Sequence, residues 1–257
     1  MAIIKNSIPI LEYSTERKTV IPPRVDGRYP SLCLFTFFGE VLEQFVRENG
    51  AREIDGFYQE MGTFPVYEAT VDGQRVALTP ATVGGPSAAM QLDSLYHGGV
   101  RHMMVCGSCG VLADLPAGHV ILPVRALRGE GTSYMYAEPS RFIELQKRPV
   151  EAAKKVLSEN GIGFTEVTTW TTDGFCRETP EMVEYRKSEG CQTVEMECAG
   201  LAAASAYLGL EYGQLLYSGD ILADTSRYDD RDFYHDGNAR KLLFGMALKT
   251  LLRLCKA

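Results

Sequence analysis

The chain has 257 residues, of which 45% are hydrophobic and 23% charged, and its formal net charge is −7. This length suits one large α/β domain with a single core. The acidic charge argues against nucleic acid or an anionic membrane as a partner, because a negative field repels both. No apolar run approaches the roughly 20 residues of a membrane span. The N-terminus lacks a signal-peptide pattern, so we expect a cytoplasmic protein.

Seven cysteines are scattered along the chain without a CxxC pair. Structural zinc sites space their cysteines in such pairs, so we predict no metal site. The segment CGSC at 106–109 is expected to open into a glycine turn instead. The remaining interpretation is that the thiols are reduced and buried, as is usual in a cytosolic protein.

The first half of the chain alternates predicted strands with helices. Residues 1–30 contain four prolines and are predicted to form an irregular arm over the surface. Continuous apolar runs predict strands buried on both faces, and Asp-Gly between two runs predicts a hairpin. In chain order we expect a strand at 31–37, a helix at 40–49, a hairpin within 66–81 around Asp72-Gly73, a helix within 84–99, and strands at 102–107 and 119–127.

The second half continues the alternation. In chain order we expect a helix over 140–161 that Pro149 could break, a strand at 164–172, helix 179–190, strand 193–197, an alanine-rich helix at 198–209, strand 212–220 and a long helix at 239–257. Strands that alternate with helices indicate βαβ units. The chain as a whole (1–257) is therefore predicted to be a single α/β domain, in which helices flank a central, twisted, mostly parallel mixed sheet.

Polar and glycine-rich clusters occur where the predicted strands end. They are Gly39, Gly84-Gly85, Gly107-Ser108, 129–136, 173–175, 195–197 and Asp220. In open α/β sheets, ligands bind outside the carboxyl ends of the strands. We therefore expect these clusters to assemble one site.

The most specific cluster is VEMECAG, residues 194–200. Alternation along a strand would send Glu195 and Glu197 to one side and Met196 to the other, if the strand extends that far. A carboxylate only accepts hydrogen bonds, so it can take both hydrogens of a vicinal diol such as that of ribose. A helix N-terminus that favours acids would explain one glutamate but not the pair around a methionine.

This segment resembles the ribose-binding signature of the nucleoside phosphorylase family. VGGPSAAM (83–90), CGSCG (106–110), GEGTSYMY (129–136), TTDGFCRET (171–179) and LLYSGD (215–220) follow the family's order, and the resemblance covers about residues 31–222. It implies cleavage of the N-glycosidic bond of a nucleoside, without a cofactor.

The resemblance also implies roles for individual residues. Glu197 would bind the ribose hydroxyls, Met196 would pack beneath the sugar, and Glu195 would support both. Phe175 would face the base, and Asp220 would protonate a purine at N7 as the bond breaks. An acid at the base suits a reaction in which the leaving base gains negative charge. The alternatives are a core position for Phe175 and a turn cap for Asp220.

The identity of the base is less strongly indicated. Uridine-type members carry a glutamine and an arginine a few residues after the phenylalanine. Residues 176–181 contain no glutamine, and Arg177 lies too close to Phe175. Together with Asp220, this difference favours a purine.

The arginines that bind phosphate in the family are replaced here by Glu43 and Val105. If phosphate is the co-substrate, it would need other donors: Ser108, the backbone amides of Gly39 and Gly107, or a relocated arginine such as Arg128. The alternative is that water is the acceptor and Glu43 the general base, as in the family's nucleosidases. Glu43 could equally be a solvated acid on a helix.

A third possibility is a non-catalytic paralogue that binds a nucleoside without cleaving it, although a binder needs no acid at the base. The resemblance further implies a homo-oligomer, either a dimer or a trimer of dimers. The N-terminal arm and the segment 226–238 are candidates for lids or interface segments, and His235 is a weak candidate for a residue donated across the interface.

Overall fold

The computed structural model describes residues 3–21 and 28–256 and confirms the α/β class. The main strands are β3 (Leu32–Thr36), β4 (Arg52–Gln59), β5 (Gly62–Val71), β6 (Gln74–Pro80), β7 (His102–Val111), β8 (Val120–Gly129), β9 (Phe142–Glu144), β10 (Phe164–Thr172), β11 (Cys191–Glu195) and β12 (Glu211–Ile221). The helices are α1 (Gly39–Asn49), α2 (Gly85–His97), α3 (Ser133–Tyr136), α4 (Lys147–Glu159), α5 (Pro180–Ser188), α6 (Cys198–Leu208) and α7 (Gly237–Lys256).

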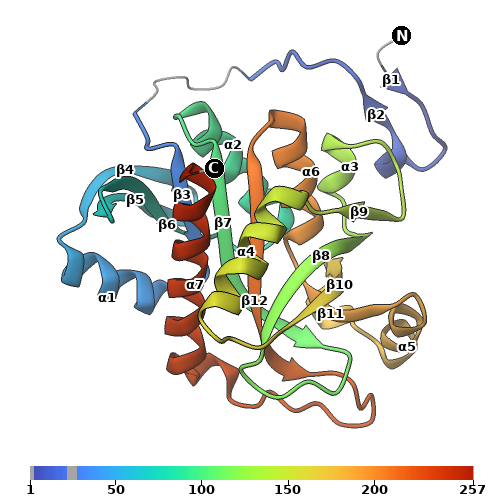
Figure 1. The fold of residues 1–257 in the computed structure, drawn as a ribbon. Helices are drawn as coiled ribbons and strands as arrows, with labels where there is room; N and C mark the ends of the chain where they lie inside the picture. Colours follow the sequence, from blue (N-terminus) through green and yellow to red (C-terminus); the bar gives the residue numbers. More distant parts are fainter. Residues whose placement is uncertain (1–2, 22–27, 257) are drawn as a thin grey trace.

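The sheet is mixed, and its long central ladders are parallel. The strand order is β11-β10-β8-β12-β7-β3-β6-β5-β4, with β9 beside β8. Helices α4 and α7 cover one face, whereas α2, α3 and α6 pack together on the other (Figure 1). The largest hydrophobic cluster lies between these helices and β3, β6, β7 and β12.

The sheet also closes on itself at one end. Besides its parallel partner β10, β11 pairs antiparallel with β7 through Thr193–Val111 and Val194–Gly110. The strands β7, β12, β8, β10 and β11 therefore form a ring of neighbours, which the sequence pattern did not predict. This closure brings β11 and β12 to the same rim.

The N-terminal arm is less irregular than predicted. Its described part contains a short antiparallel pair of β1 (Ile3–Ile4) and β2 (Tyr13–Ser14), and a 3-10 turn, η1 (Pro9–Leu11). The arm lies against α3 (Figure 1). Arg17 donates to the carbonyl of Tyr207 at the end of α6. Residues 1–2 and 22–27 of this predicted arm lie outside the described part.

The sequence predictions were wrong in three details. No strand was predicted at 52–59, where β4 forms a partly exposed edge whose sequence lacks clear alternation. The helix predicted over 140–161 is instead β9 followed by α4. Pro149 lies in the first turn of α4, where its missing N–H costs nothing, so it does not break the helix.

The third error concerns CGSC at 106–109, which is not a turn. Strand β7 continues through Val111, and Ser108 pairs there with Tyr217 of β12. All seven cysteines are free thiols, and five are buried. The expectation that all are buried was wrong for Cys176 and Cys255, which are exposed.

Candidate active site

The candidate active site lies at the carboxyl ends of β8, β10, β11 and β12, as expected. Glu195 ends β11, and Glu197 follows it as the residue before α6. Asp220 is the next-to-last residue of β12. All three carboxyl groups are on buried residues.

Glu195 is held by three donors. Its Oε2 accepts hydrogen bonds from the backbone amides of Glu197 (2.7 Å) and Cys198 (2.6 Å) at the start of α6. Its Oε1 accepts from the hydroxyl of Thr171 on β10 (2.6 Å), and that hydroxyl in turn accepts from the amide of Ala199 (3.0 Å). Glu195 therefore satisfies the free amides of a helix N-terminus and ties α6 to β10.

Glu197 has a different environment. Its Oε1 accepts from the backbone amide of Gly84 at 2.6 Å, so the loop before α2 fixes the orientation of its carboxylate. The strand has ended at Glu195, so the turn into α6, not strand alternation, places the two carboxylates close together. A carboxylate has about four acceptor positions, so Glu197 retains the capacity to bind a sugar hydroxyl.

The acids of this site depend on each other electrostatically. Burial raises the pKa of Glu195, and the nearby charge of Glu130 raises it further. Burial and the charge of Glu195 raise the pKa of Glu197. Among the described residues, no ion pair includes any of the site's acids, which are Glu130, Asp173, Glu178, Glu195, Glu197 and Asp220.

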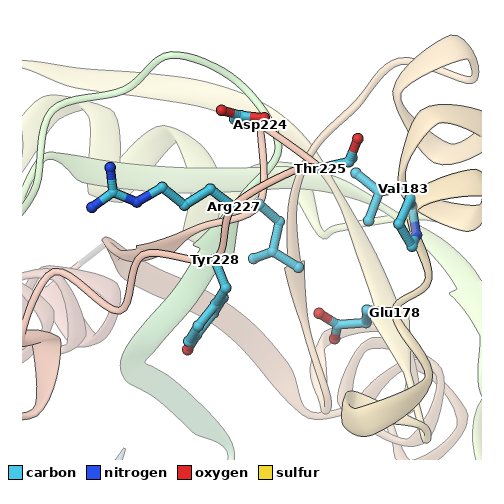
Figure 2. Close-up of a pocket in the computed structure, with 8 residues that line it drawn as sticks. Glu178, Val183, Asp224, Thr225, Arg227 and Tyr228 are labelled. Carbon is cyan, nitrogen blue, oxygen red and sulfur yellow. The ribbon is translucent and has the colours of Figure 1, made fainter.

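Asp220 lies on the wall of a hollow of about 250 Å³, together with Phe175, Cys176, Glu178, Leu222 and Tyr228. Burial raises the pKa of Asp220, while the Tyr228 hydroxyl opposes this by donating to Oδ2 at 3.1 Å. A smaller hollow of about 130 Å³ adjoins it and shares Glu178, Leu222 and Tyr228 (Figure 2). A buried acid with a raised pKa can hold a proton for a ligand in this space.

Gly110 of β7 allows this approach. A Cβ atom there would lie 2.9 Å from Val194 Cγ1 of β11 and 3.3 Å from Asp220 Oδ1 of β12. The ring closure and the absence of a side chain thus bring the carboxylate pair and Asp220 to neighbouring positions. Cys109 precedes Gly110 in the chain. Burial and the charges of Glu195 and Asp220 raise the pKa of its thiol.

Several predicted ligand residues lie around this rim. The side chain of Phe175 is 51% exposed at the mouth of the hollow, so the alternative of a core position is wrong. Met196 is half-buried between the two glutamates. Gly39 begins α1, Gly107 lies beneath the Phe37 ring, and Ser108 is half-buried within β7.

Glu43 does not join the buried acids Glu195, Glu197 and Asp220. Its side chain is 70% exposed on α1, where it forms an ion pair with Arg47 at 3.8 Å. Among the described residues, no hydrogen bond or ion pair joins Glu43 to Glu195, Glu197 or Asp220. Its role as a base therefore stays a prediction.

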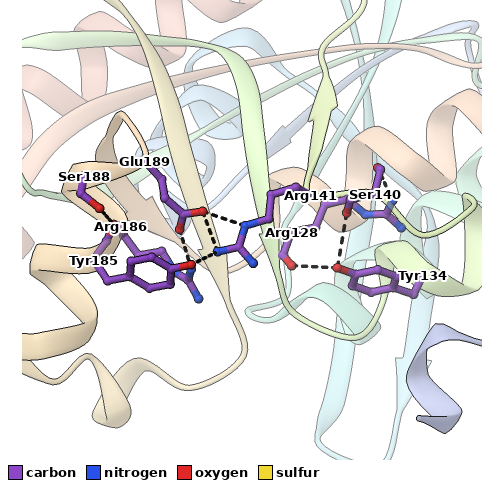
Figure 3. A network of polar contacts seen from close by, with 8 residues as sticks. All are labelled: Arg128, Tyr134, Ser140, Arg141, Tyr185, Arg186, Ser188 and Glu189. Carbon is purple, nitrogen blue, oxygen red and sulfur yellow. Dashed lines mark hydrogen bonds and ion pairs between the residues drawn. The ribbon is translucent and has the colours of Figure 1, made fainter. Parts of the chain in front are cut away.

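Arg128 is not available to bind phosphate, contrary to the possibility raised above. The side chain is buried and donates to the hydroxyls of Ser133 and Ser140 and to the carbonyls of Ala137 and Glu138. Its guanidinium also lies over the Tyr134 ring at 4.1 Å (Figure 3). Arg128 thus holds the 133–140 segment in place. Its partner Ser133 in turn donates its backbone amide to the carboxylate of Glu130.

The sequence analysis did not single out some residues of the site. Thr171 and Glu130 lie inside motifs that were recognised, but only contacts across the sheet reveal their roles. Tyr228 reaches Asp220 from a loop, and no local pattern could have linked the two. Among residues 3–21 and 28–256, no group of three or more histidine, cysteine or acidic side chains is arranged to hold a metal ion.

A model of the phosphorylase superfamily matches residues 31–252 of this sequence. The chain therefore belongs to the phosphorylase superfamily. Within the described residues, no helix is both long and apolar enough to cross a membrane.

Particular relatives differ in their names. The guanosine phosphorylase of Halorubrum lacusprofundi is 27% identical over 175 residues, which cover 66% of this chain and 71% of that protein. An AMP nucleosidase from Bacteroides thetaiotaomicron has the same fold, with a TM-score of 0.71, 22% identity and coverage of 89% of this chain and 90% of that one. A uridine phosphorylase from Vibrio fischeri matches with a TM-score of 0.76, 18% identity and coverage of 89% and 95%. Family membership therefore leaves open both the base and the acceptor.

The contacts of the two central glutamates predict different effects on stability. Glu195→Gln can keep a carbonyl oxygen toward the amides of Glu197 and Cys198, but its NH2 group then replaces the oxygen that accepts from the Thr171 hydroxyl, so we expect the free energy of unfolding to fall by about 1–3 kcal/mol. Glu197→Gln can still accept from Gly84 and should lose much less. Urea unfolding of both variants measures the difference, and equal losses would show that Glu195 does not have this structural role.

The raised pKa values also predict that stability depends on pH. Burial and the charge of Asp220 raise the pKa of Glu178 from 4.5 to about 7, and burial raises the pKa values of the Glu195–Glu197 pair above the usual value of 4.5. The native state therefore binds more protons than the unfolded state above about pH 4.5, and its stability falls as pH rises from there through 7. We expect a lower Tm at about pH 8 than at about pH 5.5, with a smaller difference in Glu197→Gln. A Tm that is constant or rises over this range would contradict the assignment.

Proposed function

We propose that this protein cleaves the N-glycosidic bond of a purine nucleoside, with Asp220 as the acid that protonates the base. The observation that carries the proposal is the position of Asp220. It is a buried acid with a raised pKa, beside the exposed ring of Phe175, on the strand rim that also bears the Glu195–Glu197 pair. A buried acid with a raised pKa is suited to give a proton to a leaving base.

The surrounding residues suit the transition state of this reaction. As the bond breaks, the base gains negative charge and the sugar becomes oxocarbenium-like. A proton from Asp220 would neutralise the base, and the Glu197 carboxylate would bind the sugar diol and favour positive charge on the ring. Met196 would offer a neutral, polarisable contact beneath the sugar. Glu195 would act indirectly, by holding the chain that carries both residues.

Phosphate is the acceptor that we propose first, because the family resemblance implies it. The candidate donors are the backbone amide of Gly39 at the start of α1, the Ser108 hydroxyl and the amide of Gly107.

The proposal includes a cytoplasmic homo-oligomer. Exposed apolar side chains beside the site, Val83 (68% exposed) and Met90 (51%), suit contact with a second copy.

Hydrolysis is the second candidate, and a specific observation favours it. Arg128 is fully engaged within its own loop, and the acids named at the site repel a phosphate dianion, whereas Arg227 is the one cation among the residues that line the two hollows. Water carries no such charge. In this case Glu43 would be the candidate base.

The role of Asp220 is tested by the isosteric variant Asp220→Asn, which cannot supply the proton. We expect kcat for purine nucleosides to fall by about 10²- to 10⁴-fold. The turn variant Asp72→Asn, far along the sheet in the β5–β6 hairpin, should keep full activity and serves as the control. Substrate binding without turnover in both the wild type and the variant would instead indicate a non-catalytic binder.

The acceptor is tested by following base release from inosine, guanosine, adenosine and uridine with and without phosphate. Phosphorolysis predicts release only with phosphate, together with ribose 1-phosphate as product. Equal release without phosphate would establish hydrolysis, and Glu43→Gln should then lower the rate. Release from uridine alone would contradict the proposed purine specificity.

A further inference from the structure

The loop that joins β12 to α7, residues 222–236, brings Tyr228 to Asp220. The Tyr228 hydroxyl donates to Oδ2 of Asp220 at 3.1 Å, and the Tyr228 side chain lines both hollows. Figure 2 shows the Tyr228 ring and the guanidinium of Arg227, its neighbour in the chain, extending from this loop in different directions. The loop therefore folds back beside the end of the strand that carries Asp220.

Contacts of the residues that follow Tyr228 fix this part of the loop. The carbonyl of Asp229 accepts from the amide of Ile221 at 2.9 Å, which pairs the loop with the last residue of β12. Arg231 donates through Nη1 to the carbonyl of Leu115 at 2.7 Å. Tyr228 is itself 59% exposed, so packing in the core does not explain its position. The anchored backbone of the loop holds the hydroxyl against Asp220 instead.

The bond to Tyr228 leaves the two oxygens of Asp220 in different surroundings. Oδ2 accepts from the hydroxyl, whereas Oδ1 lies beside Gly110, 3.3 Å from the position that a Cβ atom would occupy there. Protonation at Oδ1 keeps the bond to Tyr228 intact, because Oδ2 can still accept. A hydroxyl that holds one oxygen therefore also directs the acid proton to the other.

We propose that Tyr228 is a positioning residue, which holds Oδ2 of Asp220 so that Oδ1 gives its proton to N7 of the purine. The inference rests on the proposed function, because it takes Asp220 as the acid. As the N-glycosidic bond breaks, its electron pair passes to the base and the proton moves from Oδ1 to N7. Tyr228 then stabilises the carboxylate that remains. An acid without this bond would rotate and spend less time in the productive arrangement.

The same bond affects the pH range in which Asp220 is protonated. Burial raises the pKa of Asp220, and the Tyr228 hydroxyl lowers it by donating to the ionised form. Loss of this donor would therefore raise the pKa and keep Asp220 protonated to higher pH. The other titratable groups around Asp220 and the two hollows come from β7, from the 3-10 turn η2 (Phe175–Arg177) with the residue after it, and from the loop: Cys109, Cys176, Glu178, Asp224, Arg227, Asp230 and Arg231. Tyr228→Phe leaves all of them in place.

The kinetic test compares the wild type, Tyr228→Phe and the control Tyr185→Phe on the purine nucleoside that is cleaved fastest. Tyr185 is a similarly exposed tyrosine on α5, and its hydroxyl accepts from Arg141 at 3.2 Å. In Tyr228→Phe we expect kcat to fall by about 10-fold, and the alkaline limb on which Asp220 loses its proton to move to higher pH. Tyr185→Phe should match the wild type. An unchanged kcat, or a fall in kcat with an unmoved alkaline limb, would overturn the proposal.

A binding measurement that needs no catalysis separates this inference from the proposed function. In 9-methylhypoxanthine, the methyl group replaces the sugar and N7 is an acceptor, whereas its 7-deaza analogue has carbon at that position. By calorimetry at a pH where Asp220 is protonated, we expect the wild type to bind the former about 10-fold more tightly and Tyr228→Phe to lose most of this preference.

The outcomes of the two tests are distinct. A preference for 9-methylhypoxanthine that falls in Tyr228→Phe would support the positioning of Asp220 even if the wild type released no base from any nucleoside, which is the result that sinks the proposed function. A preference that Tyr228→Phe leaves unchanged, or its absence from the wild type, would overturn the inference even if purine nucleosides were cleaved.

Discussion

The site depends on one carboxylate, that of Glu195, which joins three elements at the rim of the sheet. It accepts from two amides at the start of α6 and from the Thr171 hydroxyl on β10. These bonds set the turn in which Met196 and Glu197 lie. Glu197 is then held from the other side by the amide of Gly84, so its carboxylate has a fixed direction before any ligand binds. Such preorganisation lowers the cost of binding.

Around this junction the protein gathers acids without neutralising them by cations. Burial raises the pKa values of Glu195, Glu197, Glu178 and Asp220, and in each case the charge of a neighbouring acid adds to the rise. The hydrogen bonds of Glu195 hold the chain in place, but the ionised form of each buried acid still opposes folding as pH rises. Raised pKa values that cluster at one rim are typical of functional sites, where the ligand supplies donors or takes a proton.

The ring closure explains why the acids meet. In an open sheet with the observed strand order, β11 would end far from β7. Here β11 pairs with both β10 and β7, and Gly110 leaves room for Val194 and Asp220 where a side chain would otherwise lie. The sugar-binding candidate and the acid candidate are therefore on adjacent parts of one rim, at a separation set by backbone hydrogen bonds.

The sequence by itself determined the α/β class and most strand and helix positions, and it singled out VEMECAG, Phe175 and Asp220 as candidates for the site. Local composition carries these features, because buried strands, glycine turns and helix caps each involve neighbouring residues. Only the tertiary structure decided that Arg128 is engaged in its own loop, that Glu43 is exposed, and that Glu178 and Tyr228 lie beside Asp220. Glu178 and Asp220 are far apart in the chain and meet only because the sheet brings the ends of β10 and β12 to one rim. The contacts of Arg128 and Tyr228 span few residues, but they depend on loop conformations that no local pattern encodes.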